Sequence, residues 1–168
     1  INEIDKAIKY IINAVETDQN SQANWSNLGL TLKNFHPVNY DNELADLYVK
    51  LLNKKIPLDP KDLIFSSLAM IKTHSIFSLK IEKLSIDDFE LELKVCEALS
   101  NIELLLQIMK ISPIVDIQIE KLFVKIRRSI LLNLNQFPKN KQITDFLIAL
   151  SCQCYLNEYI YPETSEEQ

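Results

Sequence analysis

The sequence predicts an all-α protein, an antiparallel helical bundle or a short irregular solenoid of about eight helices. Three observations support this prediction. Only one glycine, Gly29, occurs in 168 residues, although β-rich sites and nucleotide-binding loops need several glycines. No Asn-Gly or Asp-Gly hairpin signal is present. Apolar residues instead recur at helical spacing between typical helix start and stop signals.

The first half of the chain contains four predicted helices. Each has apolar residues at intervals of three and four and a breaker at its end. We expect these helices to span about residues 3–15, 22–35, 41–52 and 60–71. Pro37 ends the second helix, because the residue before a proline disfavours the helical conformation. Asp59-Pro60 is a strong start signal, because Asp59 can cap a helix and proline is favoured at its first position.

The second half continues the helical pattern. Two capping boxes, Ser85–Asp88 and Ser100–Glu103, should each open a helix. The apolar run at 104–109 predicts a central helix. A strand is conceivable at 114–119, but the absence of turn glycines favours helix throughout. The further helices are expected at about residues 76–84, 89–99, 119–134 and 142–158.

Length and composition indicate one helical domain over residues 1–162, followed by an acidic tail or linker at 163–168 that leads to a further domain. The chain starts with Ile1 and not with methionine, so we expect it to be part of a longer protein. The net charge of −5 argues against nucleic acid as a partner. No apolar run of about 18 residues predicts a membrane span, and an odd cysteine count suggests a reducing, cytoplasmic compartment.

No catalytic, cofactor-binding or metal-binding residue is expected in this chain. His36 and His74 fall at predicted helix ends, and neither has a second ligand at metal-binding spacing. No Ser-His-Asp or Cys-His arrangement can be assembled from histidines in such places. The basic cluster at 121–128 has no aromatic platform beside it, which favours a solvated helix face over RNA binding.

The last predicted helix places two amides on its apolar face. At 100° per residue, Gln153 and Asn157 lie on the same side as Phe146 and Leu150. Amides that point into a core must be hydrogen-bonded, because each unsatisfied group costs about 1–3 kcal/mol. Two interpretations stay open: these amides tie down loop carbonyls or helix ends, or they help a following domain to dock.

Two charged residues complete the set of candidate polar residues. Arg127 lies at the border of the apolar face of its helix, and it could pair with Glu158 of the last helix. The alternative interpretation is that Arg127 is a solvated surface residue.

Trp25, Leu28, Gly29 and Leu32 match the first half of a tetratricopeptide helix, with Leu32 where tyrosine is usual. The second half of that motif is missing at the standard distance, and no 34-residue period repeats. Either this is a degenerate repeat, or Gly29 permits an amphipathic helix to pack closely against a neighbour.

Three stretches together carry a family resemblance: residues 24–35, residues 113–131 and residues 146–160. They resemble the helical region of bacterial proteins that join tetratricopeptide repeats to a class I S-adenosylmethionine-dependent methyltransferase domain. The last stretch, with Gln153, Asn157 and Glu158, is the most specific part. Ile160 stands where valine is common in that family.

The resemblance implies a non-catalytic accessory domain, while the whole protein would be a methyltransferase. The chain would present a protein substrate or support its own downstream catalytic domain. S-adenosylmethionine would bind only that downstream domain. The alternative is a free-standing tetratricopeptide-like protein-interaction module. An α-helical enzyme is a third and less favoured hypothesis.

Overall fold

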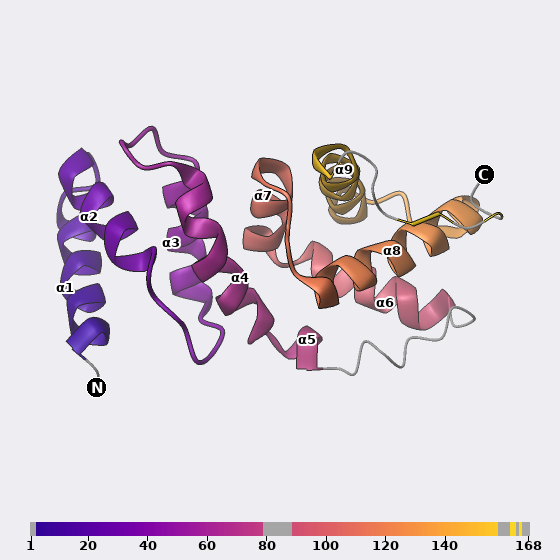
Figure 1. The fold of residues 1–168 in the computed structure, drawn as a ribbon, viewed down its shortest axis with the longest axis horizontal. Helices are drawn as coiled ribbons and strands as arrows, with labels where there is room; N and C mark the ends of the chain where they lie inside the picture. The colour runs from indigo at the N-terminus through magenta and orange to yellow at the C-terminus, as the bar shows by residue number, and fades with distance from the viewer. Residues whose placement is uncertain (1–2, 79–88, 158–161, 164, 166–168) are drawn as a thin grey trace. The chain divides into compact units, whose positions relative to one another are not determined.

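The computed structural model describes residues 3–78, 89–157, 162–163 and 165. Within these ranges the chain forms nine α-helices and two 3₁₀ turns, and no strand occurs there (Figure 1). The prediction of an all-α fold is therefore confirmed. The ladder of hydrogen bonds inside each helix satisfies the backbone without the tight glycine turns that a sheet would need.

The chain divides into two compact units, Ile1–His74 and Ser75–Gln168. Each unit contains its own set of fully buried apolar side chains, such as Leu28 in the first and Phe123 in the second. Whether the two units associate into the single domain expected over residues 1–162 stays a prediction.

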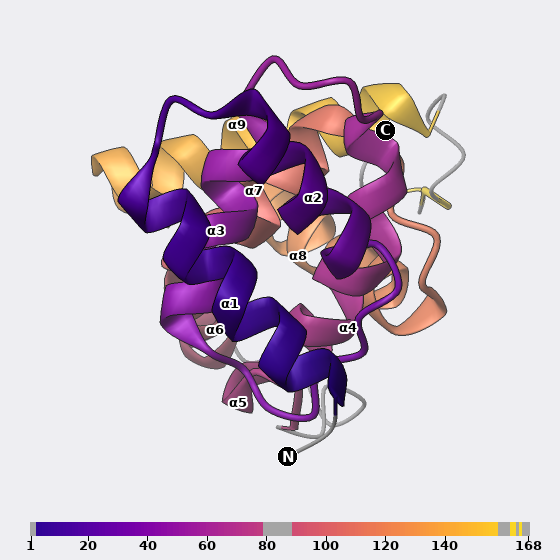
Figure 2. The ribbon, with the colours of Figure 1, turned by 90° about the vertical axis from the view of Figure 1, so that its left-hand side faces the viewer.

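The first unit begins with an antiparallel hairpin, in which α1 and α2 pack side by side (Figures 1 and 2). Its core includes Trp25 and Tyr48, with exposed fractions of 4% and 0%. The observed elements are α1 (Glu3–Thr17), α2 (Gln22–Leu32), α3 (Asn42–Leu52), the 3₁₀ turn η1 (Pro60–Leu63) and α4 (Ile64–Lys72).

Side-chain caps define the starts of these helices. The Ser21 hydroxyl accepts a hydrogen bond from the Asn24 N–H (3.2 Å), and the Asp41 carboxylate accepts one from the Leu44 N–H (3.0 Å). Asp59 caps the turn that Pro60 opens, as predicted, but this first turn is 3₁₀ and the α-helix follows it. Such caps satisfy donors that a helix leaves unpaired at its start.

Gly29 lies within α2 at a close approach to the segment after α3. A Cβ on this residue would lie 2.5 Å from Leu58 Cδ2 and 3.5 Å from Leu51 Cδ2. The glycine therefore gives Leu58 room to pack against the helix, which is the close-packing interpretation of the Trp25–Leu32 motif.

The second unit is organised around α9, which packs against α6 and α7 (Figure 1). The apolar run in α7 is buried, as predicted, and Leu105 and Ile108 have no exposed surface. The observed elements are α5 (Ser75–Ser78), α6 (Phe89–Ser100), α7 (Glu103–Ile111), α8 (Ile117–Leu132), the 3₁₀ turn η3 (Leu134–Gln136) and α9 (Lys141–Leu156). None of the helices in the described ranges combines the length and apolar character needed to cross a bilayer.

One predicted helix start is wrong. Ser100 does not cap α7: it is the last residue of α6, and its hydroxyl donates to the Glu97 carbonyl (2.7 Å). A serine in a last turn often bonds back to its own helix, which removes it as a cap. Ile102 occupies the cap position of α7 without a side-chain hydrogen bond. The Ser85–Asp88 box and residues 79–84 lie outside the described residues.

Candidate functional site

Helix α9 has an inner face that belongs to the core of the second unit. Asn140 begins the helix, because its carboxamide oxygen accepts a hydrogen bond from the Ile143 N–H (2.9 Å). Side chains at intervals of three and four then point inward. The buried members of this face are Ile143, Phe146, Ala149, Leu150 and Gln153.

Gln153 joins this inner face to the end of α7. Its Nε2 donates to the Met109 carbonyl (2.7 Å) and to the Ser112 carbonyl (2.6 Å). Its Oε1 accepts from the Ile114 N–H (3.0 Å). The side chain has no exposed surface, so these three bonds satisfy polar groups that water cannot reach. Because Lys110 lies within this last turn of α7, Gln153 also fixes its position relative to α9.

The outer side of α9 lines an open hollow of about 600 Å³. Its residues on α9 follow helical spacing over about three turns, so they form one continuous face. We call this set the outer face of α9, and it consists of Thr144, Leu147, Ile148, Ser151, Cys152, Tyr155 and Leu156.

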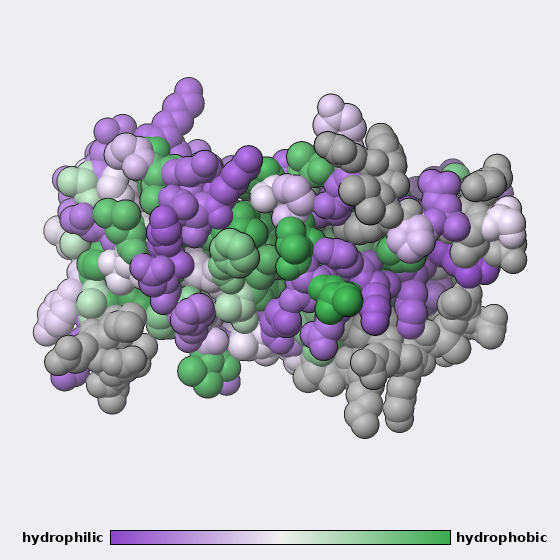
Figure 3. Space-filling model, viewed as in Figure 1, coloured by the Kyte–Doolittle hydropathy of each residue, from purple (hydrophilic) through white to green (hydrophobic). Residues whose placement is uncertain are grey.

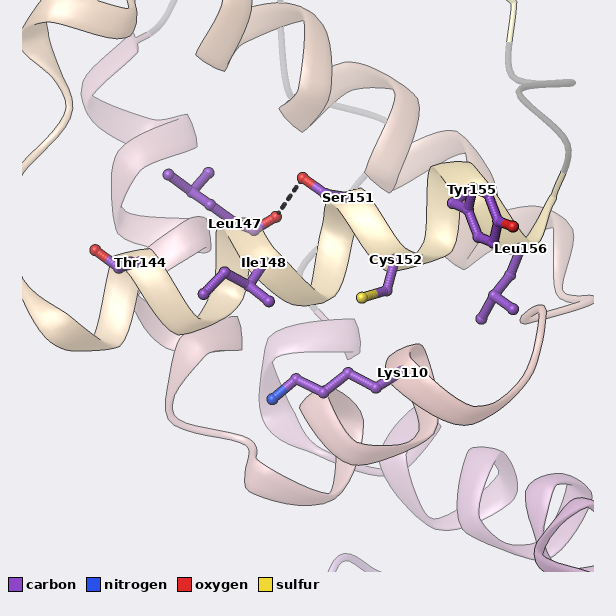
Figure 4. Close-up of a pocket in the computed structure, with 8 residues that line it drawn as sticks. All are labelled: Lys110, Thr144, Leu147, Ile148, Ser151, Cys152, Tyr155 and Leu156. Atoms are coloured by element: carbon purple, nitrogen blue, oxygen red, sulfur yellow. Dashed lines mark hydrogen bonds between the residues drawn. The ribbon is translucent and has the colours of Figure 1, made fainter.

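The outer face is apolar in character. The hydroxyls of Thr144 and Ser151 donate to carbonyls one turn back, at 2.8 and 2.9 Å. These polar atoms are therefore satisfied within α9, as the dashed line in Figure 4 shows for Ser151. Ile148 and Tyr155 are 51% and 69% exposed. The helix thus presents apolar surface to the solvent on the side opposite its core contacts.

Lys110 forms the remaining wall of the hollow. Figure 4 shows its side chain extending along α9 beneath Ile148 and Cys152. It lies in the last turn of α7, where a cation interacts favourably with the helix dipole. Within the part of the chain that the structure describes, Lys110 makes no ion pair. The eight residues around the hollow include no carboxylate and no histidine.

Periodicity distinguishes this face from other exposed apolar residues. In Figure 3 green apolar side chains reach the surface at several places among purple hydrophilic ones. Val38 and Val115, for example, are 85% and 81% exposed. Scattered exposed apolar residues are normal on protein surfaces, whereas a contiguous apolar face is a candidate interaction site.

The other candidate polar residues lie near the end of α9. Asn157 is half-buried, and its backbone N–H donates to the Gln153 carbonyl (3.0 Å), which ends the helix. Arg127 is half-buried on α8, and its Nη2 donates to the Pro162 carbonyl (2.7 Å). Arg127 therefore anchors Pro162 to α8. Glu158 lies outside the described residues, so its pairing with Arg127 stays a prediction.

Burial changes the pKa values of two of the three cysteines. Burial raises the pKa of the Cys154 thiol, and the nearby Arg127 guanidinium only partly offsets this effect. Burial also raises the pKa of Cys96 to about 12. Both thiols are therefore held in the protonated, less nucleophilic form. No cluster of three or more histidine, cysteine or carboxylate ligands occurs among the described residues.

The outer face and Lys110 are functional candidates that the sequence patterns did not single out. The sequence did contain a signal for this face: Ile148 is an apolar residue that lies about 160° away from Phe146 on a helical projection, on the side opposite the core. Leu147 is half-buried and lines the hollow at the border between the two faces. The contribution of Lys110 required the packing of α7 against α9.

Comparison of the chain with models of known protein families, with curated proteins and with solved structures gives no match. The functional conclusion therefore rests on the geometry of the outer face and on the sequence resemblance described above.

Proposed function

We propose that this chain is a non-catalytic helical accessory domain that docks a protein partner through the outer face of α9. The observation that carries this proposal is the apolar hollow formed by that face and Lys110. The partner is a methyltransferase domain that the chain supports, or a protein that the chain presents to it. The methyltransferase assignment comes from the sequence resemblance.

The chemistry of the hollow favours a protein partner over a reacting small molecule. Covering exposed apolar surface stabilises a complex by about 25 cal/mol per Å² removed from water. Apolar and aromatic residues such as Ile148 and Tyr155 are typical of the centre of a protein interface. Catalytic pockets instead bring together several polar groups with perturbed pKa values, and the lining of this hollow offers no acid or histidine.

The cofactor implied by the resemblance does not fit the residues of this chain. Class I methyltransferases approach S-adenosylmethionine with a glycine-rich turn. The sequence contains one glycine, which lies within α2 and faces Leu58. We therefore derive no cofactor-binding step from this chain and assign the cofactor to the methyltransferase domain.

Photo-crosslinking from the outer face tests the proposal. Tyr155 would be replaced by benzoylphenylalanine in the cells that make the protein, with the exposed Tyr10 of α1 replaced in a matched control. We expect a covalent adduct from position 155, but not from position 10, with a polypeptide that binds S-adenosylmethionine or is methylated. Ile148→Asp should abolish the adduct. An adduct that survives Ile148→Asp, or none from position 155, would contradict the proposal.

The alternative is a free-standing tetratricopeptide-like interaction module, and a groove in the first unit favours it. This groove of about 800 Å³ lies between α1 and α3, with Ile8 and Leu47 among its apolar residues and Lys50 at its rim. If it were the docking surface, benzoylphenylalanine at position 50 would yield the adduct, and position 155 would yield none.

A further inference from the structure

We propose that the occupant of the hollow is an amphipathic helix of about three turns that carries one carboxylate on the flank facing Lys110. This inference rests on the proposed function, because it names the chemistry of the partner that docks on the outer face of α9. The inference is carried by the juxtaposition of a continuous apolar helix face with Lys110, which makes no ion pair with any residue that the structure describes.

The length of the occupant follows from the spacing of the lining residues. The outer face runs from Thr144 to Tyr155, which corresponds to about 16 Å along the helix axis. A partner helix that packs along α9 can bury apolar residues against it at intervals of three and four over the same distance. In Figure 4, Ile148, Cys152 and Leu156 all point to the side of α9 on which Lys110 lies. The partner helix therefore packs along this row, with the lysine at its flank.

The charge of the occupant follows from Lys110. Docking an apolar helix beside this ammonium group removes part of its hydration, which is costly unless an opposite charge replaces the water. A carboxylate on the flank of the partner helix satisfies this requirement and fixes the register. One carboxylate fits better than an acidic run, because the chain has a net charge of −5 and repels negative partners at long range.

A second copy of this chain does not meet the same requirement. The outer face contains no carboxylate, so packing it against its own copy would bring no negative charge to Lys110 from that face. Two outer faces packed against each other would therefore leave the charge of Lys110 without a counter-charge from either face.

The test uses the full 168-residue chain and a display library of three-turn helices. The library carries leucine on one face and randomised residues on both flanks. Peptides are selected on the immobilised chain and then measured against four variants by fluorescence anisotropy. Ile148→Asp has Leu131→Asp as its control, because these residues are 51% and 52% exposed. Lys110→Glu has Lys121→Glu, a lysine of α8 outside the hollow, as its control.

We expect selected peptides to carry an acidic residue on one flank and to lose binding to the Ile148→Asp variant but not to the Leu131→Asp control. Lys110→Glu should weaken binding about fivefold at low salt, as for a partly exposed ion pair. Changing the acidic residue of the peptide to lysine should restore binding to Lys110→Glu, and neither control should matter.

Three results would overturn the inference. Peptides that need Ile148 but show no acidic preference would leave the docking face standing and refute the charge. Peptides indifferent to Ile148→Asp would refute helix docking at this face, and the adduct from position 155 would then decide whether the proposed function also fails. Sedimentation that shows a dimer abolished by Ile148→Asp would identify a second copy as the occupant.

Discussion

Gln153 is the residue on which the geometry of the hollow most depends. Gln153→Ala would leave the Met109 and Ser112 carbonyls and the Ile114 N–H without their partner. We expect the free energy of unfolding to fall by about 3 kcal/mol, since unsatisfied buried groups cost about 1–3 kcal/mol each and some rebinding occurs.

Gln142→Ala is the matched control for this prediction, because Gln142 is an exposed glutamine of the same helix that bonds to Asn101 Oδ1 (3.1 Å). Its cost should stay within about 0.5 kcal/mol. Urea denaturation measures both variants, and equal losses would show that the three bonds of Gln153 contribute no special stability.

Gly29 and Leu58 should be energetically coupled. Alanine is better than glycine in a helix by about 1 kcal/mol, but the new Cβ would lie 2.5 Å from Leu58 Cδ2. We expect Gly29→Ala to gain that stability when Leu58→Ala is already present, and to gain less or lose stability alone. A double-mutant cycle by urea denaturation measures the difference, and simple additivity would refute the close-packing role of Gly29.

Tyr48 makes stability dependent on alkaline pH. Burial raises the pKa of Tyr48 to about 12, while the pKa of a tyrosine in the unfolded chain is about 10. The folded state therefore holds the proton more tightly, and this stability is fully present below about pH 10 and lost as pH rises toward about 12. Tyr48→Phe should flatten the fall in unfolding free energy by up to about 1.4 kcal/mol per pH unit.

A measurement at pH 8 isolates the hydrogen bond that Tyr48→Phe removes, because the Tyr48 hydroxyl donates to the Leu32 carbonyl (3.3 Å). Only the change in slope at higher pH then reports the titration. Identical slopes for the variant and the wild type would contradict the buried, neutral phenol.

At the scale of the element, α9 has two faces with different roles. Phe146→Ala on the inner face should cost about 3–5 kcal/mol, because it removes a fully buried ring. Ile148→Ala on the outer face should cost less than about 1 kcal/mol, because its side chain is half exposed. Thermal denaturation compares them. A large loss for Ile148→Ala would mean that the outer face supports the fold and is not reserved for a partner.

Helical periodicity made the elements predictable, while helix ends and distant contacts were less so. The apolar spacing in α7 and α9 was sufficient to predict helices there, because local spacing fixes which residues share a face. Ser100 was misassigned because its hydroxyl bonds within α6, a choice that the downstream sequence does not reveal. The partners of Gln153 lie 41 and 44 residues away for its Nε2, so only the packing of α7 against α9 identifies them.

At the scale of the whole molecule, the proposed docking surface is separate from the buried side chains that stabilise the fold. The two units contain their own buried side chains, and the hollow belongs entirely to the second unit. The low glycine content that predicted the all-α fold agrees with the helices that make up the described residues.

The most direct test of the central claim is amide hydrogen exchange across the whole chain, with and without the partner captured from position 155. Docking on the outer face predicts slower exchange in α9 and in the last turn of α7, with no change in α1 and α3. Slower exchange confined to α1 and α3, or unchanged exchange in α9, would contradict the claim that this face binds the partner.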